Sequence, residues 1–262
     1  MLLKDKVVIV SGIGPGLGKE LAIEAAKQGA KLAICARTAS KLVDVETEIR
    51  SLGLMNEIIQ LPTDIADPLQ CKLLVEATIA AFGRIDCLIN SAYNPGSFDY
   101  VEKANLDGWR EAMEVNLFGT LSLTQEVIPQ MKEQGGGSIV MVNTMVTRRP
   151  MPTQAGYGAS KAALSSAAAH LALELGPYNI RVNSTYMGWM WGPPVQGYFD
   201  AMSARTGISA EELKAEVEKN IALGAIPDDA DCAKAVMFLA SDYSCAITGA
   251  ALDVNGGEFI PH

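Results

Sequence analysis

Short apolar runs rich in β-branched residues alternate along this chain with longer segments of helix-forming composition. Such alternation is typical of consecutive βαβ units, in which parallel strands are buried on both faces. It predicts an α/β fold with a doubly wound parallel sheet of about seven strands and helices on both faces. The expected strands are residues 6–10, 31–36, 57–61, 85–89, 138–142, 180–184 and 250–254. The expected helices are residues 16–28, 40–52, 68–82, 106–132, 155–175 and 228–240.

No linker, internal repeat or change of composition divides the chain, so a single domain over residues 1–262 is expected. One segment interrupts the alternation. Aromatic and proline residues crowd residues 186–198, and Ser209 with Glu212 then forms the sequence pattern of a helix-capping box. We therefore expect a small substrate lid over about residues 186–222.

The chain is acidic, because 21 lysine and arginine residues against 30 aspartate and glutamate residues give a formal net charge of −9. Such a surface repels nucleic-acid phosphates and anionic lipids, so binding to neither is expected. The uncharged residues 182–199 contain glycine and proline and are predicted to form a loop, not a membrane span. The five cysteines lie in apolar runs, and charged residues begin at Lys4, which leaves no room for a signal peptide. Both features are typical of a cytoplasmic protein.

The first expected strand is followed by a glycine-rich segment, Ser11-Gly12-Ile13-Gly14-Pro15-Gly16-Leu17-Gly18. Glycine allows a tight turn and a close approach of backbone amides to a diphosphate, while the following helix N-terminus contributes partial positive charge. A tight turn without a ligand would also use glycine. Four glycines in seven positions between a strand and a helix favour a dinucleotide site.

The spacing of these glycines resembles the TGxxxG[IL]G turn of the short-chain dehydrogenase/reductase family, with Ser11 where threonine is usual. The resemblance continues along the whole chain and implies a Rossmann-type fold. Asn90-Ser91-Ala92-Tyr93 resembles the family's NNAG motif, with Tyr93 in place of glycine. The resemblance implies coenzyme contacts by Ser11, Gly12, Gly14, Gly16, Leu17, Gly18, Asp64, Ile65, Asn90 and Ala92. A helix-capping or loop carboxylate is the alternative role of Asp64.

The choice between NADP and NAD depends on the end of the second expected strand. An acidic residue there would bind the adenosine ribose and repel a 2′-phosphate. This chain has Ala36 followed by Arg37, which resembles the NADP-preferring members. A guanidinium pairs with phosphate through parallel charge-assisted hydrogen bonds, so NADP is expected over NAD. NAD stays open, because the alternative role of Arg37 is that of a solvated loop cation.

Tyr157 and Lys161 lie four residues apart, so a helix brings both side chains to one face. A free phenol has a pKa near ~10, and a fixed cation would favour the phenolate near neutral pH. Taken alone, such a pair is more often a surface pair. Here it follows the fifth expected strand, and Tyr157-Gly158-Ala159-Ser160-Lys161 resembles the family's YxASK motif.

The resemblance adds two catalytic candidates. The family places a serine hydroxyl thirteen residues before the tyrosine, and Thr144 stands there with its hydroxyl kept. Strand packing is its alternative role. Asn116 matches the family's asparagine, which helps to hold the lysine through a bound water on a proton path; a helix cap or kink is the alternative. The expected catalytic residues are Asn116, Thr144, Tyr157 and Lys161, of which Tyr157 and Lys161 also contact the coenzyme.

Two departures from the family pattern follow residues 180–184, which resemble its IRVN segment. Met187 replaces the proline before Gly188, and Gly192 stands where the family has a threonine that helps to hold the nicotinamide amide and the phosphates. Met187 and Gly188 are still expected at the coenzyme.

Aromatic residues crowd the expected lid, which favours an apolar, cyclic ligand over an inner lid wall or an oligomer contact. Arg148 and Arg149 precede Tyr157 and could hold a carboxylate, phosphate or carrier-linked acyl group, or face water. The expected substrate-pocket residues are Tyr93, Met145, Arg148, Trp189 and Trp191. His170 and His262 lack acidic or cysteine neighbours at ligand spacing, so no metal site is expected.

Together these features predict an oxidoreductase that moves hydride between NADP(H), or alternatively NAD(H), and a small-molecule secondary alcohol or ketone. One alternative is a 3-oxoacyl-ACP/CoA reductase, favoured only by the two adjacent arginines. The other is a non-catalytic nucleotide-binding sensor or scaffold, which would not require the tyrosine, lysine and threonine together. The resemblance also implies a homo-oligomer, a tetramer or dimer built through the helices at residues 106–132 and 155–175.

Overall fold

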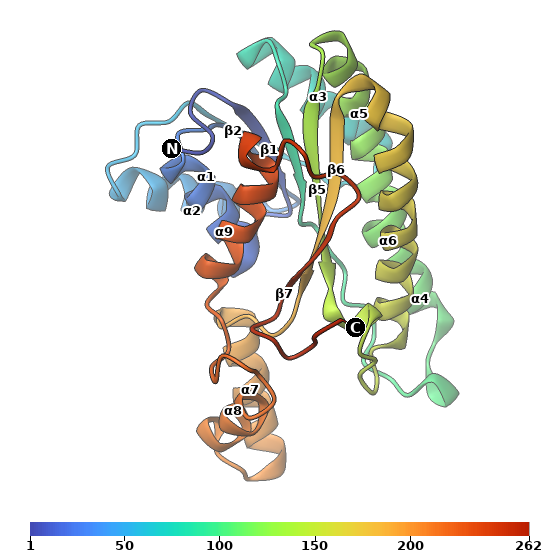
Figure 1. Cartoon of the computed structure of the whole chain (residues 1–262). Coiled ribbons are helices and arrows are strands. Elements are labelled where there is room, and N and C mark those ends of the chain that lie inside the picture. The colour runs from blue at the N-terminus through green and yellow to red at the C-terminus, as the bar shows by residue number, and fades with distance from the viewer. Residues whose placement is uncertain (262) are drawn as a thin grey trace.

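The computed structural model describes residues 1–261, and its centre is a sheet of seven parallel strands (Figure 1). The strands are β1 (Val7–Ser11), β2 (Lys31–Ala36), β3 (Ile58–Pro62), β4 (Cys87–Asn90), β5 (Gly137–Thr144), β6 (Ile180–Met187) and β7 (Ala251–Val254). Their order in the sheet is β3-β2-β1-β4-β5-β6-β7. The chain therefore winds outward from β1 in one direction and from β4 in the other, as in the expected doubly wound α/β fold.

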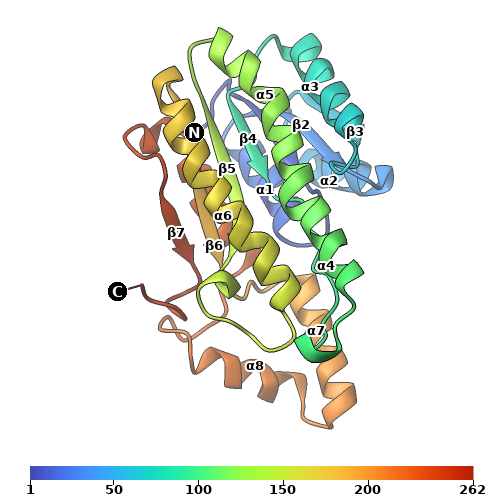
Figure 2. The same cartoon turned by 90° about the vertical axis from the view of Figure 1, so that its right-hand side faces the viewer.

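Helices cover both faces of this sheet (Figures 1 and 2). One face carries α1 (Leu17–Lys27), α2 (Ala39–Ser51) and α9 (Asp229–Ala240). The opposite face carries α3 (Pro68–Phe82), α5 (Thr120–Glu133) and α6 (Ala155–Leu175). Two apolar cores result, and successive residues of β1 supply them in turn: Val8 and Val10 enter one and Ile9 the other. None of the described helices is long and apolar enough to cross a membrane.

The helix expected over residues 106–132 is present, but it is not a regular α-helix throughout. The structure has α4 (Leu106–Met113), a π-helical segment at Glu114–Gly119 and then α5. A π-helical turn inserts one extra residue, and here Thr120 Oγ1 reaches back to the Val115 carbonyl at 3.3 Å. Gly119 in this segment lies against the backbone of Ile65, where a Cβ would be 2.8 Å from the Ile65 oxygen.

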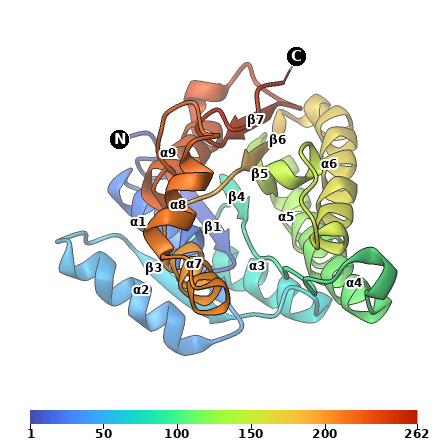
Figure 3. The ribbon, with the colours of Figure 1, turned by 90° about the horizontal axis from the view of Figure 1, so that it is seen from below.

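The loop predicted over residues 182–199 is also partly wrong. β6 continues to Met187, and α7 (Pro193–Thr206) begins within the proline-rich stretch, because proline suits the first turn of a helix. α8 (Ala210–Glu218) follows with the predicted capping box. Together α7 and α8 project beyond the carboxyl end of β6 (Figures 1 and 3). They enclose a third, smaller apolar cluster, centred on Phe199, Ile221 and Ile226.

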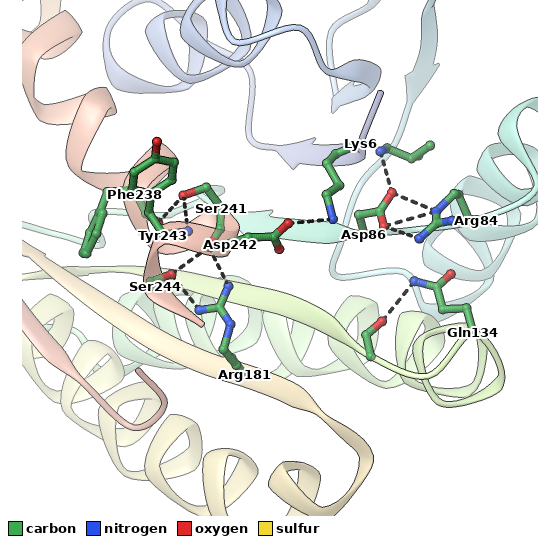
Figure 4. A network of polar contacts seen from close by, with 12 residues as sticks. Lys6, Arg84, Asp86, Gln134, Arg181, Phe238, Ser241, Asp242, Tyr243 and Ser244 are labelled. Atoms are coloured by element: carbon green, nitrogen blue, oxygen red, sulfur yellow. Dashed lines mark hydrogen bonds and ion pairs between the residues drawn. The ribbon is translucent and has the colours of Figure 1, made fainter. Parts of the chain in front are cut away.

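The amino ends of the strands are tied together by polar contacts (Figure 4). Asp86 accepts hydrogen bonds from the Val7 amide at 2.8 Å and from the Arg84 guanidinium. The Arg181 guanidinium donates to the Ser241 carbonyl at 3.0 Å and to Ser244 Oγ at 2.8 Å. These contacts join β1, β4 and β6 to the end of α9, so the ligand-binding edge is the opposite, carboxyl edge.

The glycine turn between β1 and α1 packs tightly against that carboxyl edge. Gly12 has φ +87°, and a Cβ on it would lie 2.3 Å from the Ala92 amide nitrogen. A Cβ on Gly18 would lie 2.1 Å from the Gly12 carbonyl oxygen. Gly14, between them, has no neighbouring atom within 4 Å of that position. The turn therefore needs glycine at Gly12 and Gly18 for packing but not at Gly14.

Replacing Gly18 by alanine is expected to lower the free energy of unfolding by about 1–3 kcal/mol, because the methyl group overlaps backbone that cannot move away. The matched change Gly14→Ala should alter it by less than about 0.5 kcal/mol. Urea denaturation of the three proteins measures both values. Equal stability of the two variants would contradict this account of the turn.

Candidate active site

A cavity of about 640 Å³ opens at the carboxyl edge of the sheet, between the sheet and the lid helix α7. Its walls come from the segments that follow β1 to β6 and from the start of α6. A cavity of this size suits a small organic ligand or part of a dinucleotide. It lies at the point where the strand order reverses, between β1 and β4, where doubly wound sheets bind nucleotides.

The glycine turn forms the middle of the cavity floor, through Gly12, Gly14, Leu17 and Gly18. The amides of Leu17 and Gly18, the first two of α1, have no hydrogen-bond partner among the described residues, and both residues line the cavity. With no side chain at Gly14, a ligand can reach the backbone directly. These features fit the diphosphate of a dinucleotide.

Two residues of the turn that were expected to contact the coenzyme, Gly16 and Ser11, do not line the cavity. Gly16 packs beside Asp229 and Pro194 and does not line the cavity. Ser11 is the last residue of β1, fully buried, with no hydrogen-bond partner for its hydroxyl among the described residues. A fully buried side chain inside the sheet supports the turn without reaching a ligand.

One end of the cavity is lined by Arg37, Thr38 and Lys41, with Asp64 and Ile65 across from them. Arg37 was expected there, but Lys41 was missed. Its signal in the sequence is its position four residues after Arg37, at the start of a helix. Asp64 lines the cavity, where it was expected, and it also accepts a hydrogen bond from the Ala66 amide at 3.1 Å, as a loop carboxylate does.

Beyond β4, the structure separates residues that the sequence places together. Ala92 and Tyr93 line the cavity, whereas Asn90 lies beneath it. Asn90 Nδ2 donates to Thr124 Oγ1 at 3.1 Å and to Met141 Sδ at 3.3 Å, so it joins β4 to α5 and β5. Asn90 therefore supports the site and does not line it.

Thr144, Tyr157 and Lys161 converge at the other end of the cavity. Thr144 ends β5, and the other two lie one turn apart on α6, which packs along β5 and β6. The Thr144 side chain is near enough to the Tyr157 hydroxyl to lower its pKa. Lys161 is 2% exposed, and its Nζ donates to the Val142 carbonyl at 2.8 Å.

The expected lowering of the Tyr157 pKa by Lys161 is not what this structure has. Burial raises the pKa of Tyr157, the nearby Tyr93 raises it further, and only the Thr144 side chain lowers it. The Lys161 ammonium is turned to the Val142 carbonyl, and burial lowers its own pKa to about 8. The phenol therefore keeps its proton near neutral pH, which is the state that donates to a carbonyl oxygen.

Asn116 is fully buried in the π-helical segment and does not line the cavity. Its side chain accepts from the Asn94 amide at 2.7 Å and donates to the Asn94 carbonyl and to Ser160 Oγ, both at 2.8 Å. It thus links the loop after β4 to the helix that carries Tyr157 and Lys161. No direct contact joins Asn116 to Lys161 in the described residues.

The expected substrate-pocket residues divide into three groups. Tyr93 and Trp189 line the cavity, together with the expected coenzyme residues Met187 and Gly188. Met145 lines a smaller adjoining cavity of about 170 Å³. Trp191 and Arg148 lie outside, contrary to expectation.

Trp191 and Arg148 both contact other residues outside the cavity. Trp191 packs on Phe199 with ring centroids 6.2 Å apart, under the Lys214 ammonium. Arg148 forms an ion pair with Asp253, and its guanidinium lies 3.8 Å above the Tyr186 ring. Sequence reasoning also missed Phe98 and Asp229, which line the cavity and which no local motif indicates.

No group of histidine, cysteine or acidic residues among residues 1–261 could hold a metal ion. His262, which entered the expectation of no metal site, lies outside the described residues. All five cysteines are free thiols.

The lowered pKa of Lys161 predicts a pH-dependent cost of its burial. Because the folded pKa of about 8 lies below the ordinary 10.5, the ammonium destabilises the fold increasingly as pH falls from 10.5 to 8, and no further below that. Lys161→Met should therefore gain stability over the wild type by about 1.4 kcal/mol per pH unit between pH 10 and 8. Urea denaturation at several pH values measures this gain, with Lys41→Met as the control. A gain independent of pH would contradict the prediction.

Comparison with known proteins places this geometry in a family. A family model described as Enoyl-(Acyl carrier protein) reductase matches residues 12–258. An uncharacterized short-chain type dehydrogenase/reductase of Sinorhizobium fredii, y4mP, is 33% identical over 264 residues, 99% of this chain and 100% of that protein. The 3-oxoacyl-[acyl-carrier-protein] reductase FabG of Staphylococcus aureus is 30% identical over 256 residues, 97% of this chain and 98% of FabG.

Levodione reductase of Leifsonia aquatica is 28% identical over 254 residues, 97% of this chain and 94% of that protein. A crystal structure of levodione reductase superposes with a TM-score of 0.91 at 26% identity and covers 98% of both chains. The match of sequence over nearly the whole length, and of fold, agrees with the resemblance carried by the glycine turn and the YxASK motif. The chain belongs to the short-chain dehydrogenase/reductase family of oxidoreductases.

Proposed function

We propose that this protein interconverts a ketone and a secondary alcohol with a nicotinamide coenzyme. The observation that carries the proposal is the convergence of the Thr144 hydroxyl, the Tyr157 phenol and the Lys161 ammonium on one cavity that also contains the glycine turn. A bound nicotinamide supplies or accepts the hydride. The protein then has to hold the reacting carbon near that ring and exchange one proton with the substrate oxygen.

The side chains divide this work. In the direction of reduction, Thr144 donates a hydrogen bond to the carbonyl oxygen, and Tyr157 gives it a proton. Burial keeps the phenol protonated until then, since it raises the pKa of Tyr157. Lys161 lines the same cavity one turn along α6, and its ammonium has to leave the Val142 carbonyl to stabilise the phenolate that remains, because a positive charge favours the deprotonated phenol. Asn116 acts indirectly, by holding the Asn94 loop against Ser160 of α6.

The substrate in this proposal is apolar and cyclic. The walls around Tyr157 are aromatic: Tyr93 meets it edge-on with ring centroids 6.3 Å apart, and Trp189 and Tyr198 lie 5.4 Å apart on the lid side. Aromatic faces bind flat apolar rings with little loss of side-chain entropy. Levodione reductase is among the relatives of this chain, which supports a reductase of ketones.

The alternative, a 3-oxoacyl-ACP/CoA reductase, has support in the relationship to FabG. The arginines that favoured it are engaged elsewhere, since Arg148 pairs with Asp253, and Arg149 pairs with Glu258 at 2.8 Å. Neither guanidinium is left to bind a carrier phosphate. We therefore place the small-molecule ketone first.

NADP is the proposed preference over NAD. Arg37 and Lys41 bring two positive charges to one end of the cavity, and Ala36 stands where an acidic residue would repel a 2′-phosphate. Thr38 adds a hydroxyl donor between them.

The proposal also includes a homo-oligomer that forms through α5 and α6, which is supported by the exposed Leu173 on α6. It further includes a cytoplasmic location, which is supported by the free thiols.

Replacing Tyr157 by phenylalanine tests the chemical step. The variant lacks the proton donor but keeps the ring, so kcat should fall by about 100-fold or more while the Kd for NADPH is nearly unchanged. Coupled absorbance at the nicotinamide band over a series of cyclic ketones measures kcat, and fluorescence titration measures the Kd. Tyr178→Phe, at an exposed tyrosine outside the cavity, serves as the control.

Turnover that survives in Tyr157→Phe would exclude the assigned proton donor. A wild type that binds NADPH and turns over no carbonyl compound would favour the nucleotide-binding sensor instead.

Replacing Arg37 by alanine tests the coenzyme preference. Loss of a charge-assisted contact to the 2′-phosphate should lower kcat/KM for NADPH by about 10- to 100-fold and leave the value for NADH almost unchanged. Steady-state kinetics with both coenzymes measures the two ratios. Arg110→Ala, at an exposed surface ion pair, controls for the loss of charge. A wild type that prefers NADH would refute the proposal.

A further inference from the structure

An acidic residue that the proposed mechanism does not use lies beside the glycine turn. Asp229 is the first residue of α9, is 6% exposed, and lines the cavity. Its Oδ2 would be 3.2 Å from a Cβ on Gly16, the residue directly before the free amides of α1. A carboxylate at this place lies beside the glycine turn to which we assign the diphosphate. The negative charge of a diphosphate would disfavour a second negative charge there.

Gly192 makes room for this carboxylate. A Cβ on Gly192 would lie only 1.7 Å from Asp229 Oδ2, so the carboxylate fills the space that any larger residue would need. Backbone contacts fix the arrangement: the Trp191 amide donates to the Pro227 carbonyl at 2.7 Å, and the Asp229 amide donates to the Trp191 carbonyl at 3.3 Å. The sequence resemblance leads one to expect a hydroxyl at position 192, and the structure has the carboxyl of Asp229 there instead.

No hydrogen bond or ion pair satisfies the Asp229 carboxylate among residues 1–261. The charged groups that face it from α1 are Lys19 and Glu20, and the Lys19 ammonium is already held by Glu20 at 3.3 Å and by Glu48 at 3.0 Å. From α9 itself, Asp228 and Cys232 are near, and Tyr93 faces it from the loop after β4. Gly192 and Pro194 of the lid carry no titratable group.

Burial is the main reason that the pKa of Asp229 is raised to about 6, with Glu20 and Asp228 adding to the rise and Lys19 opposing it. The free protein therefore holds Asp229 mostly ionised at pH 8. A diphosphate on the glycine turn would bring a second anion into the same water-poor cavity, which raises the cost of the ionised carboxylate further.

We propose that Asp229 contacts the coenzyme as a carboxylic acid, taking one proton from solvent when the diphosphate binds and donating a hydrogen bond to a diphosphate oxygen. This inference rests on the proposed coenzyme binding and adds a residue and a proton to it. Coenzyme affinity should then fall as pH rises, by up to about tenfold per pH unit. This fall covers the pH range in which Asp229 is protonated in the bound protein and ionised in the free protein.

Isothermal titration calorimetry at pH 8 in buffers of different ionisation enthalpy counts the protons taken up. We expect about 0.5 to 1 proton per NADPH for the wild type. The 2′-phosphate does not contribute, since its second pKa of about 6 leaves it fully ionised at pH 8. ADP-ribose, which carries the diphosphate without nicotinamide, should give the same uptake.

Asp229→Asn should take up about 0.5 to 1 proton fewer than the wild type, because the amide donates its hydrogen bond at every pH. The variant should also bind NADPH more tightly than the wild type at pH 8, with a Kd that varies much less with pH. Asp228→Asn removes the same charge at an exposed neighbour and should keep the proton uptake of the wild type. Lys161 titrates near pH 8 in the same cavity, and the comparison of variants cancels its contribution.

The inference is overturned if Asp229→Asn takes up as many protons as the wild type, or if the difference between the two proteins occurs with NADPH and not with ADP-ribose. Where the variant folds poorly, the wild type is measured at pH 7, at which Lys161 is already mostly protonated and Asp229 still mostly ionised. No proton uptake on binding ADP-ribose at that pH overturns the inference. Failure of the wild type to bind either nucleotide would instead refute the proposed coenzyme function, and the inference with it.

Discussion

The reversal of strand order between β1 and β4 is the constraint on which the rest of this molecule depends. Parallel pairing sets the two strands side by side, with Ser11 opposite Asn90, while their following segments run to opposite faces of the sheet. A crevice is left where the segments part, and the close contact of Gly12 with Ala92 forms its floor. Because β5 and β6 continue the same parallel sheet, their polar ends reach the same crevice.

The polar groups at the two edges of the sheet differ in their partners: at one edge they pair within the protein, and at the other they line the cavity. At the amino edge, Asp86 and Arg181 are satisfied by neighbouring strands and by the end of α9. At the carboxyl edge, the α1 amides, the Tyr157 phenol and the Asp229 carboxylate are turned to the cavity. Groups that folding leaves without strong partners are available to a ligand, and their titration depends on what binds. The aromatic side chains of Tyr93, Trp189 and Tyr198 line the same cavity, and Tyr93 and Tyr198 are themselves about half exposed.

Much of the fold and part of the site could be predicted from the sequence, for local reasons. Strand and helix positions follow from hydrophobic period, and the glycine turn and the Tyr157–Lys161 pair are contiguous motifs whose geometry is set by one turn of chain. The π-helical segment around Asn116 was missed because the hydrophobic period does not show where one turn of a helix takes up an extra residue. The helix at Pro193 was missed because glycine and proline also mark loops.

Chain order by itself determined the alternation of strands and helices, the turn at the first helix, and the one-turn spacing that joins a phenol to an ammonium. Only the tertiary structure decided which of the nearby polar groups face the cavity. It turned Lys161 to the Val142 carbonyl, paired Arg148 with Asp253, and brought Asp229 against Gly16 and Gly192 from far along the chain. Such choices depend on burial and on partners supplied by other elements, which no local pattern contains.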